Sequence, residues 1–163
     1  YIENFNNGVC NIKCHYRDNK LFGEYIKNFT SGVCNIKSHY RNDKLSGEYI
    51  ENYHNGTPYI KCYFLDDMKH GEYMQFHENG LLLIYCSNYI NDKINGTYAT
   101  FTADGQLSTE GEYRVDIKHG VHKDYYKICG KHLVLEELYD NGVLQNQRVS
   151  QVRSEIFRDL LEE

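Results

Sequence analysis

Hydrophobic and polar residues alternate along most of the chain, in short segments that glycine separates. In segment 33–40, VCNIKSHY, one side of the alternation carries Cys34, Ile36, Ser38 and Tyr40, and the other carries Val33, Asn35, Lys37 and His39. Successive side chains of a strand point to opposite faces, so the segment is predicted to be a half-buried β-strand. Segment 9–16, VCNIKCHY, divides in the same way, and the first side continues in later segments as Ile60, Cys62, Phe64, Leu82, Ile84 and Cys86. This side is predicted to form the core.

The same pattern returns about every 24 residues. FGEYIKNFTSG at 22–32 is followed by SGEYIENYHNG at 46–56 and HGEYMQFHENG at 70–80, and the leading glycines are Gly23, Gly47, Gly71, Gly96 and Gly120. A chain that repeats at such a spacing builds one unit many times. Each unit contains two strands, with a pair such as Asn-Gly or Asp-Gly between them that favours a tight hairpin turn. Six copies predict an all-β, elongated antiparallel hairpin meander over residues 1–146.

The last residues, 147–163, lose the glycines and change period. Val149, Val152, Ile156 and Leu160 follow helical spacing, with Phe157 and Leu161 beside them. This predicts a C-terminal amphipathic α-helix. Two roles stay open for it: capping the open end of the array, or docking on a partner or a second copy of the chain.

Composition narrows the classes of partner. The chain of 163 residues has a formal net charge of −5, which argues against nucleic-acid binding and weakens any tight binding to anionic membranes. The first residues lack the pattern of a signal peptide, although Tyr1 already falls inside a repeat. Equivalent cysteines of successive hairpins would lie two strands, or roughly 10 Å, apart, which is too far for a disulfide. We therefore expect the six cysteines to be small hydrophobic residues in a reducing compartment, the cytoplasm.

The repeated strings resemble those of a known family. GEYIKNFTSG, GEYIENYHNG and GEYMQFHENG, joined by DNKLFG and NDKLSG, are similar to the MORN repeat, in the variant form of bacterial and large-virus proteins. The resemblance covers residues 1–146, with departures at LLLIYCSNY and at His122, which stands in a tyrosine position. It implies an elongated β-sheet array that binds other molecules and has no catalytic residues. Roles linked to the family are protein scaffolding, dimerisation, phospholipid contact and, for some bacterial members, action as an antitoxin.

Motifs for chemistry are not found in the sequence. It contains no CxxC or HxxxH spacing for zinc, and no GxSxG or phosphate-binding loop. Glu24, Glu48 and Glu72 recur in one register, which is typical of a structural column, whereas an active site normally occurs once. We therefore expect a non-enzymatic protein without a metal or a cofactor.

The polar side of the alternation changes character in the middle of the array. There it carries Tyr59, Lys61, Tyr63, Leu81, Leu83 and Tyr85. An apolar, tyrosine-rich patch of this kind is typical of a protein-binding surface. The alternative is that a loop, the tail helix or a local register slip covers the patch. We expect a viral or bacterial scaffold that binds a protein, a second copy included, in the cytoplasm (the host cytoplasm for a virus). Association with a membrane through the column Lys13, Lys37 and Lys61 is the alternative.

Overall fold

The computed structural model describes residues 1–128 and 130–152, which form one open antiparallel sheet of fourteen strands. No helix occurs within these residues. The strands are β1 (Ile2–Asn4), β2 (Cys10–Arg17), β3 (Lys20–Asn28), β4 (Cys34–Arg41), β5 (Lys44–Asn52), β6 (Pro58–Leu65), β7 (Met68–Phe76), β8 (Leu82–Ile90), β9 (Lys93–Ile94), β10 (Gly96–Phe101), β11 (Leu107–Arg114), β12 (Ile117–Ile128), β13 (Lys131–Asp140) and β14 (Val143–Val152).

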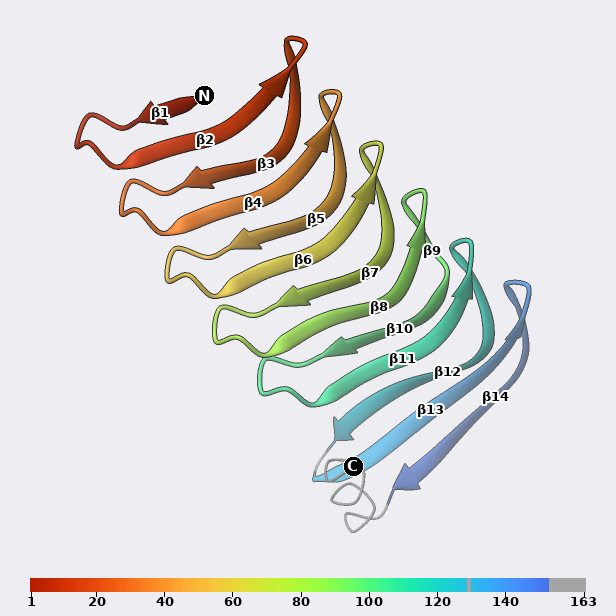
Figure 1. The fold of residues 1–163 in the computed structure, drawn as a ribbon. Coiled ribbons are helices and arrows are strands. Elements are labelled where there is room, and N and C mark those ends of the chain that lie inside the picture. The colour runs from red at the N-terminus through yellow and green to blue at the C-terminus, as the bar shows by residue number, and fades with distance from the viewer. Residues whose placement is uncertain (129, 153–163) are drawn as a thin grey trace.

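The strands follow one another in the sheet in chain order, except that the short β9 pairs with β8 beside the main path. Figure 1 shows the hairpins stacked side by side from the N-terminus to the C-terminus, each curved in the same sense. The predicted hairpin meander is therefore confirmed.

The tightest turns lie at one end of the hairpins and contain two residues. Both residues have positive φ in each of Asp18–Asn19, Asn42–Asp43, Asp66–Asp67, Asn91–Asp92, Val115–Asp116 and Asn141–Gly142. Positive φ at both positions defines the type I′ hairpin turn, which asparagine and aspartate tolerate better than other non-glycine residues. The Asn-Gly segments at the opposite end, expected to form the tight turns, are longer loops such as residues 5–9, closed by a hydrogen bond from Gly8 N to Phe5 O (2.9 Å).

Each hairpin bends at its leading glycine. Ser38 pairs with Tyr49 and Tyr40 with Leu45, so two extra residues of β5 are accommodated around Gly47. Gly47 has φ +126°, and a Cβ there would lie 3.2 Å from His39 Cβ. A side chain at this position would therefore be strained, which explains why glycine returns in each copy. We call the segment between the leading glycine and the two-residue turn the distal arm, and Figure 1 shows it curving away from the rest of the hairpin.

The two faces of the sheet carry different rows of side chains. The tyrosine face has a row in which Cys14, Tyr25, Ser38, Tyr49, Cys62, Tyr73, Cys86 and Tyr98 pair in succession. The lysine face has the row Ile2, Lys13, Ile26, Lys37, Ile50, Lys61, Met74, Tyr85 and Ala99. Because directly paired residues share a face, the register defines both faces along the whole array.

The core lies on the tyrosine face, in the middle of the array. Cys62, Tyr73 and Cys86 are buried there, with rings and aliphatic side chains such as Tyr49, Phe64 and Ile84 packed around them. Tyr73 lies edge-on to Tyr89, with ring centroids 5.6 Å apart, and the pairs Tyr25–Tyr40, Tyr49–Phe64 and Tyr98–Tyr113 repeat this contact. Small residues alternate with the tyrosines along this row and leave space for the rings. Five residues of the predicted core side belong to this core: Ile60, Cys62, Phe64, Ile84 and Cys86.

The expected C-terminal helix is wrong where it can be checked. Residues 147–152 belong to β14, which pairs with β13 from Asp140–Val143 to His132–Val152. Val149 and Val152 fit helical spacing, but valine favours strands, and the free edge of β13 offers backbone partners for a full ladder. Residues 153–163, which contain Ile156, Phe157, Leu160 and Leu161, lie outside the described residues.

Candidate functional site

Two of the six residues expected in the binding patch lie at bulges. Glu51 pairs with Ile60 and Asn52 with Pro58, so Tyr59 is an extra residue of β6. The Tyr59 hydroxyl accepts a hydrogen bond from Gln75 Nε2 (3.3 Å), and Gln75 Oε1 accepts one from the Tyr73 hydroxyl (3.1 Å). Tyr59 therefore joins the tyrosine face, and Leu83 occupies the equivalent bulge position in β8.

The other four residues do not restore a single patch. Lys61, Tyr63 and Tyr85 follow the alternation of the lysine face, and Tyr63 is 49% exposed. Leu81 lies in a loop, where its Cδ1 atom is 3.5 Å from the position of a Cβ on Gly105 in the next loop. The six residues are thus divided between two faces and a loop, because a bulge in each strand shifts the alternation by one residue.

The lysine column is a regular row, as its spacing predicted, but its charges are partly neutralised. Lys37 Nζ lies 3.4 Å from Glu24 Oε1, and Lys61 Nζ lies 5.8 Å from the centre of the Phe76 ring. Isoleucines alternate with the lysines, so the row is not a continuous basic strip. This arrangement offers limited attraction for an anionic membrane surface.

The rim of the two-residue turns changes character along the array. In the first two hairpins the residues that pair across the turn are Arg17 with Lys20 and Arg41 with Lys44. In the later hairpins they are Leu65 with Met68, Ile90 with Lys93, Arg114 with Ile117 and Asp140 with Val143. Each pair lies one residue beyond an aromatic side chain of the tyrosine face, such as Tyr40 or Tyr89, so the paired side chains lie on the lysine face. The rim pairs are therefore wholly basic in the first two hairpins, wholly apolar in the third, and made of one apolar and one charged residue in each later hairpin.

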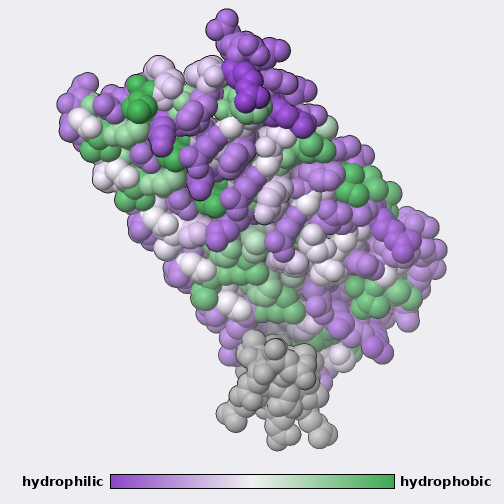
Figure 2. Space-filling view, in the orientation of Figure 1, coloured by the Kyte–Doolittle hydropathy of each residue, from purple (hydrophilic) through white to green (hydrophobic). Residues whose placement is uncertain are grey.

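We define the rim patch as the six exposed hydrophobic residues at these later turns. Their exposed fractions range from 37% for Met68 to 62% for Val143, and the members are Leu65, Met68, Ile90, Val115, Ile117 and Val143. Figure 2 shows a rim that is purple at the first hairpins and has green patches along the later ones. Exposed apolar residues gathered in one region mark a binding surface more strongly than scattered ones.

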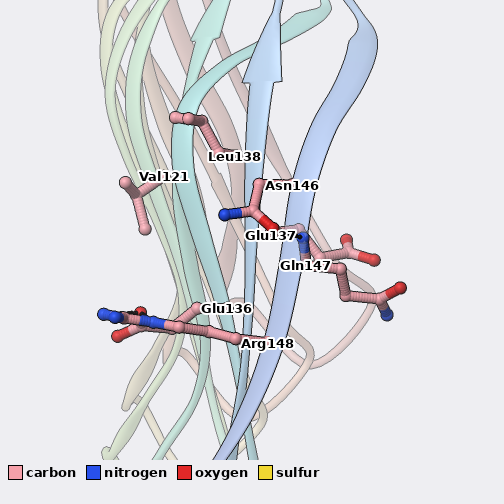
Figure 3. Close-up of a pocket in the computed structure, with 7 residues that line it drawn as sticks. All are labelled: Val121, Glu136, Glu137, Leu138, Asn146, Gln147 and Arg148. Atoms are coloured by element: carbon pink, nitrogen blue, oxygen red, sulfur yellow. Dashed lines mark hydrogen bonds and ion pairs between the residues drawn. The ribbon is translucent and has the colours of Figure 1, made fainter.

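A shallow pocket of about 170 Å³ lies on β12, β13 and β14, and no residue of the rim patch lines it. Val121 and Leu138 pair with each other there and are 50% and 43% exposed. Figure 3 shows them on one side of the sheet, together with the ion pair of Glu136 and Arg148, while Glu137 and Gln147 point to the other side.

The tyrosine face has one polar network that the repeat does not explain. His122 replaces the tyrosine of its column and is buried above Gly111, where a Cβ would lie 2.1 Å from His122 Nδ1. Its Nε2 lies 2.8 Å from the carbonyl oxygen of Glu112. Burial lowers the pKa of His122, and Lys118 acts in the same direction.

Glu137 takes the small-residue position opposite His122. It accepts a hydrogen bond from the Tyr139 hydroxyl (2.8 Å) and lies 3.7 Å from Lys118 Nζ. These side chains fill the space around the His122 ring, which is smaller than a tyrosine ring, and Lys118 balances the charge of Glu137. We therefore interpret the network as a packing feature of the last hairpins.

The cysteines behave as small core residues. Cys14, Cys62 and Cys86 are buried, Cys10 and Cys34 are half-buried, and all five are free thiols, while Cys129 lies outside the described residues. Burial raises the pKa of Cys62 to about 11, so its thiol is unreactive at neutral pH. Within residues 1–128 and 130–152, no three His, Cys, Asp or Glu side chains are grouped to hold a metal ion.

The rim patch was not predicted from the sequence, although its signal was present there. In the strings RDNKL, RNDKL, LDDMK, INDKI and RVDIK, arginine gives way to leucine and isoleucine before the turn, and valine replaces asparagine or aspartate within one turn.

The described residues contain no helix that is both long and apolar enough to span a membrane. No protein-family model matches the chain, and no curated protein matches it.

Proposed function

We propose that this chain is a MORN-like, non-catalytic repeat scaffold that binds another protein through the distal arms of its later hairpins. The observation that carries the proposal is the rim patch, a row of exposed hydrophobic residues at turns whose counterparts in the first two hairpins are charged. Each of these residues keeps between 37% and 62% of its surface exposed, and burial of that apolar surface against a partner would be favourable.

The setting of this function stays as the sequence indicated. The repeat strings resemble those of bacterial and large-virus proteins, and free thiols in a sheet core fit a reducing cytoplasm. Binding to a toxin would be a case of the same protein-binding activity with one particular partner.

Variants of the patch test the proposal in a pull-down from native lysate. The rim variant carries Leu65→Ser, Ile90→Ser and Ile117→Ser. The control variant carries Tyr126→Ser, Ile128→Ser and Val149→Ser, which removes exposed apolar residues outside the rim patch. Circular dichroism and urea unfolding must first show that both variants keep the sheet.

The expected result is a protein that the parent and the control variant capture and the rim variant loses. The proposal is wrong if the same proteins are captured by all three baits. A flotation assay with anionic vesicles examines the membrane alternative, and flotation that disappears when Lys13, Lys37 and Lys61 are changed to serine would favour it.

A further inference from the structure

The rim patch is bordered by carboxylates. Asp66, Asp67, Asp92, Asp116 and Asp140 stand in or beside its turns, with the cations Lys93 and Arg114 among them. Asp66 is already paired with Arg41 of the preceding hairpin (3.3 Å), and Asp140 lies 3.8 Å from His119. Three of these aspartates each use one oxygen to accept a backbone N–H from the preceding hairpin: Asp67 from Leu45 (2.8 Å), Asp92 from Lys69 (2.8 Å) and Asp116 from Ile94 (2.7 Å). These bonds fix the carboxylates of Asp67, Asp92 and Asp116 along the rim, and none of these three forms an ion pair with another described residue.

The spacing of the patch is set by the repeat. Successive two-residue turns lie two strands apart, or roughly 9.6 Å. The turns at 66–67, 91–92, 115–116 and 141–142 therefore extend over roughly 29 Å. An α-helix advances about 10.5 Å in seven residues, so an apolar residue at every seventh position meets one turn after another.

We infer that the rim patch binds an amphipathic α-helix of a partner protein, of about twenty residues, with apolar residues at heptad spacing and lysine or arginine beside them. The inference rests on the proposed function and specifies its partner. The apolar stripe of the helix would cover Leu65, Ile90, Ile117 and Val143, while its basic flanks would meet the carboxylates.

The backbone at Val115 supports this use of the rim. Val115 has φ 53° and Asp116 φ 67°, a conformation that the other turns reach with asparagine, aspartate or glycine. A β-branched residue with positive φ is strained, and such strain tends to persist where function requires the side chain. The hydrophobic residue is thus kept at the centre of the patch against the local preference of the turn.

The probe for this inference is a synthetic peptide of twenty-one residues, with leucine at heptad positions a and d and lysine elsewhere. A matched peptide replaces lysine with glutamate. Fluorescence anisotropy measures the binding of each labelled peptide to the full chain, at low and at moderate salt. The rim and control variants are used again, with a third variant that carries Asp67→Asn, Asp92→Asn and Asp116→Asn. Asparagine keeps an oxygen for the backbone hydrogen bonds and removes the charge.

The lysine peptide is expected to bind the parent at least tenfold more tightly than the rim variant, with the control variant within twofold of the parent. The asparagine variant should bind severalfold more weakly, with a smaller dependence on salt. The inference is overturned if the glutamate peptide binds equally well, or if the rim and control variants lose affinity equally.

The pull-down separates this inference from the proposed function. If capture of a protein depends on the rim while the lysine peptide does not bind, the helical, basic partner is wrong and the protein-binding function stands. If neither the capture of a protein nor the binding of the lysine peptide depends on the rim, both the inference and the proposed function are wrong. A dimer of the parent in light scattering that the rim variant abolishes would assign the patch to a second copy of the chain, and would also overturn the inference.

Discussion

Replacing Val115 by asparagine should stabilise the protein. Val115 occupies the first position of a type I′ turn with φ 53°, where the other five turns have aspartate or asparagine. The left-handed conformation costs an ordinary L-residue about 1–2 kcal/mol, and asparagine is among the residues that tolerate it. Val115 is 48% exposed, so the apolar burial lost on substitution amounts to about 0.5–1 kcal/mol. The net expectation is a gain of about 0.5–1 kcal/mol in the free energy of unfolding.

Urea unfolding followed by tyrosine fluorescence measures this change, since the chain has 16 tyrosines and no tryptophan. The matched reverse substitution is Asn91→Val, at the same position of the turn between β8 and β9. Asn91 is exposed, so valine gains little burial there. The left-handed backbone conformation should then lower the free energy of unfolding by about 1–2 kcal/mol. If Val115→Asn leaves stability unchanged or lowers it, while Asn91→Val is also neutral, backbone strain is not what distinguishes this turn.

The same variant links stability to binding. Val115→Asn removes a hydrophobic side chain from the rim patch, so it should weaken binding of the lysine peptide while it raises the midpoint of urea unfolding. A variant that is more stable and binds equally well would show that the valine has no part in binding.

Three further changes test the packing of the tyrosine face. Gly111→Ala should lower the free energy of unfolding by about 1–3 kcal/mol, because its Cβ would meet the His122 ring. Urea unfolding of the double variant Gly111→Ala, His122→Ala should show that part of this loss is recovered. Burial lowers the pKa of His122 in the fold, so the unfolded chain takes up the proton first as the pH falls below about 6.5, and the free energy of unfolding falls. His122→Phe should therefore reduce the loss of stability between pH 7.5 and pH 5.5. Equal losses in the parent and His122→Phe would contradict this. Ser38→Cys should raise the free energy of unfolding by about 1 kcal/mol, because the buried Ser38 hydroxyl lacks a hydrogen-bond partner among the described residues. A lower melting temperature of this variant would refute the expectation.

The sequence predicted the hairpin array because its signals are local and repeated. Alternation marked the strands, the repeated Asn-Gly and Asp-Gly pairs marked a connection at one end of each hairpin, and each copy supported the same interpretation. The tail was different. Residues 147–152 follow a helical spacing, and nothing within them reveals that β13 offers a free edge to pair with. A long-range pairing of this kind competes with local periodicity and cannot be read from the segment alone.

The binding residues were harder to predict because a bulge moves them between faces. Tyr59 and Lys61 are two positions apart, and strict alternation places them on the same face. The extra residue at Tyr59 instead turns its side chain toward Gln75 and Tyr73 on the tyrosine face. Bulges depend on the register between two strands, and the sequence of one strand does not fix that register.

Departures from the repeat differ in whether the fold compensates for them, and this difference separates packing from function. His122 is accompanied by Gly111, which makes room for its ring, and Glu137 is accompanied by Lys118 and Tyr139, which satisfy its charge. Such paired changes restore a stable core and need no further explanation. Val115 has no comparable compensation, because its strained backbone holds an exposed hydrophobic side chain beside carboxylates. A departure that costs more stability than its partial burial returns is expected to gain a contact outside the chain, and for this reason we place the binding site at the rim rather than in the polar network of the last hairpins.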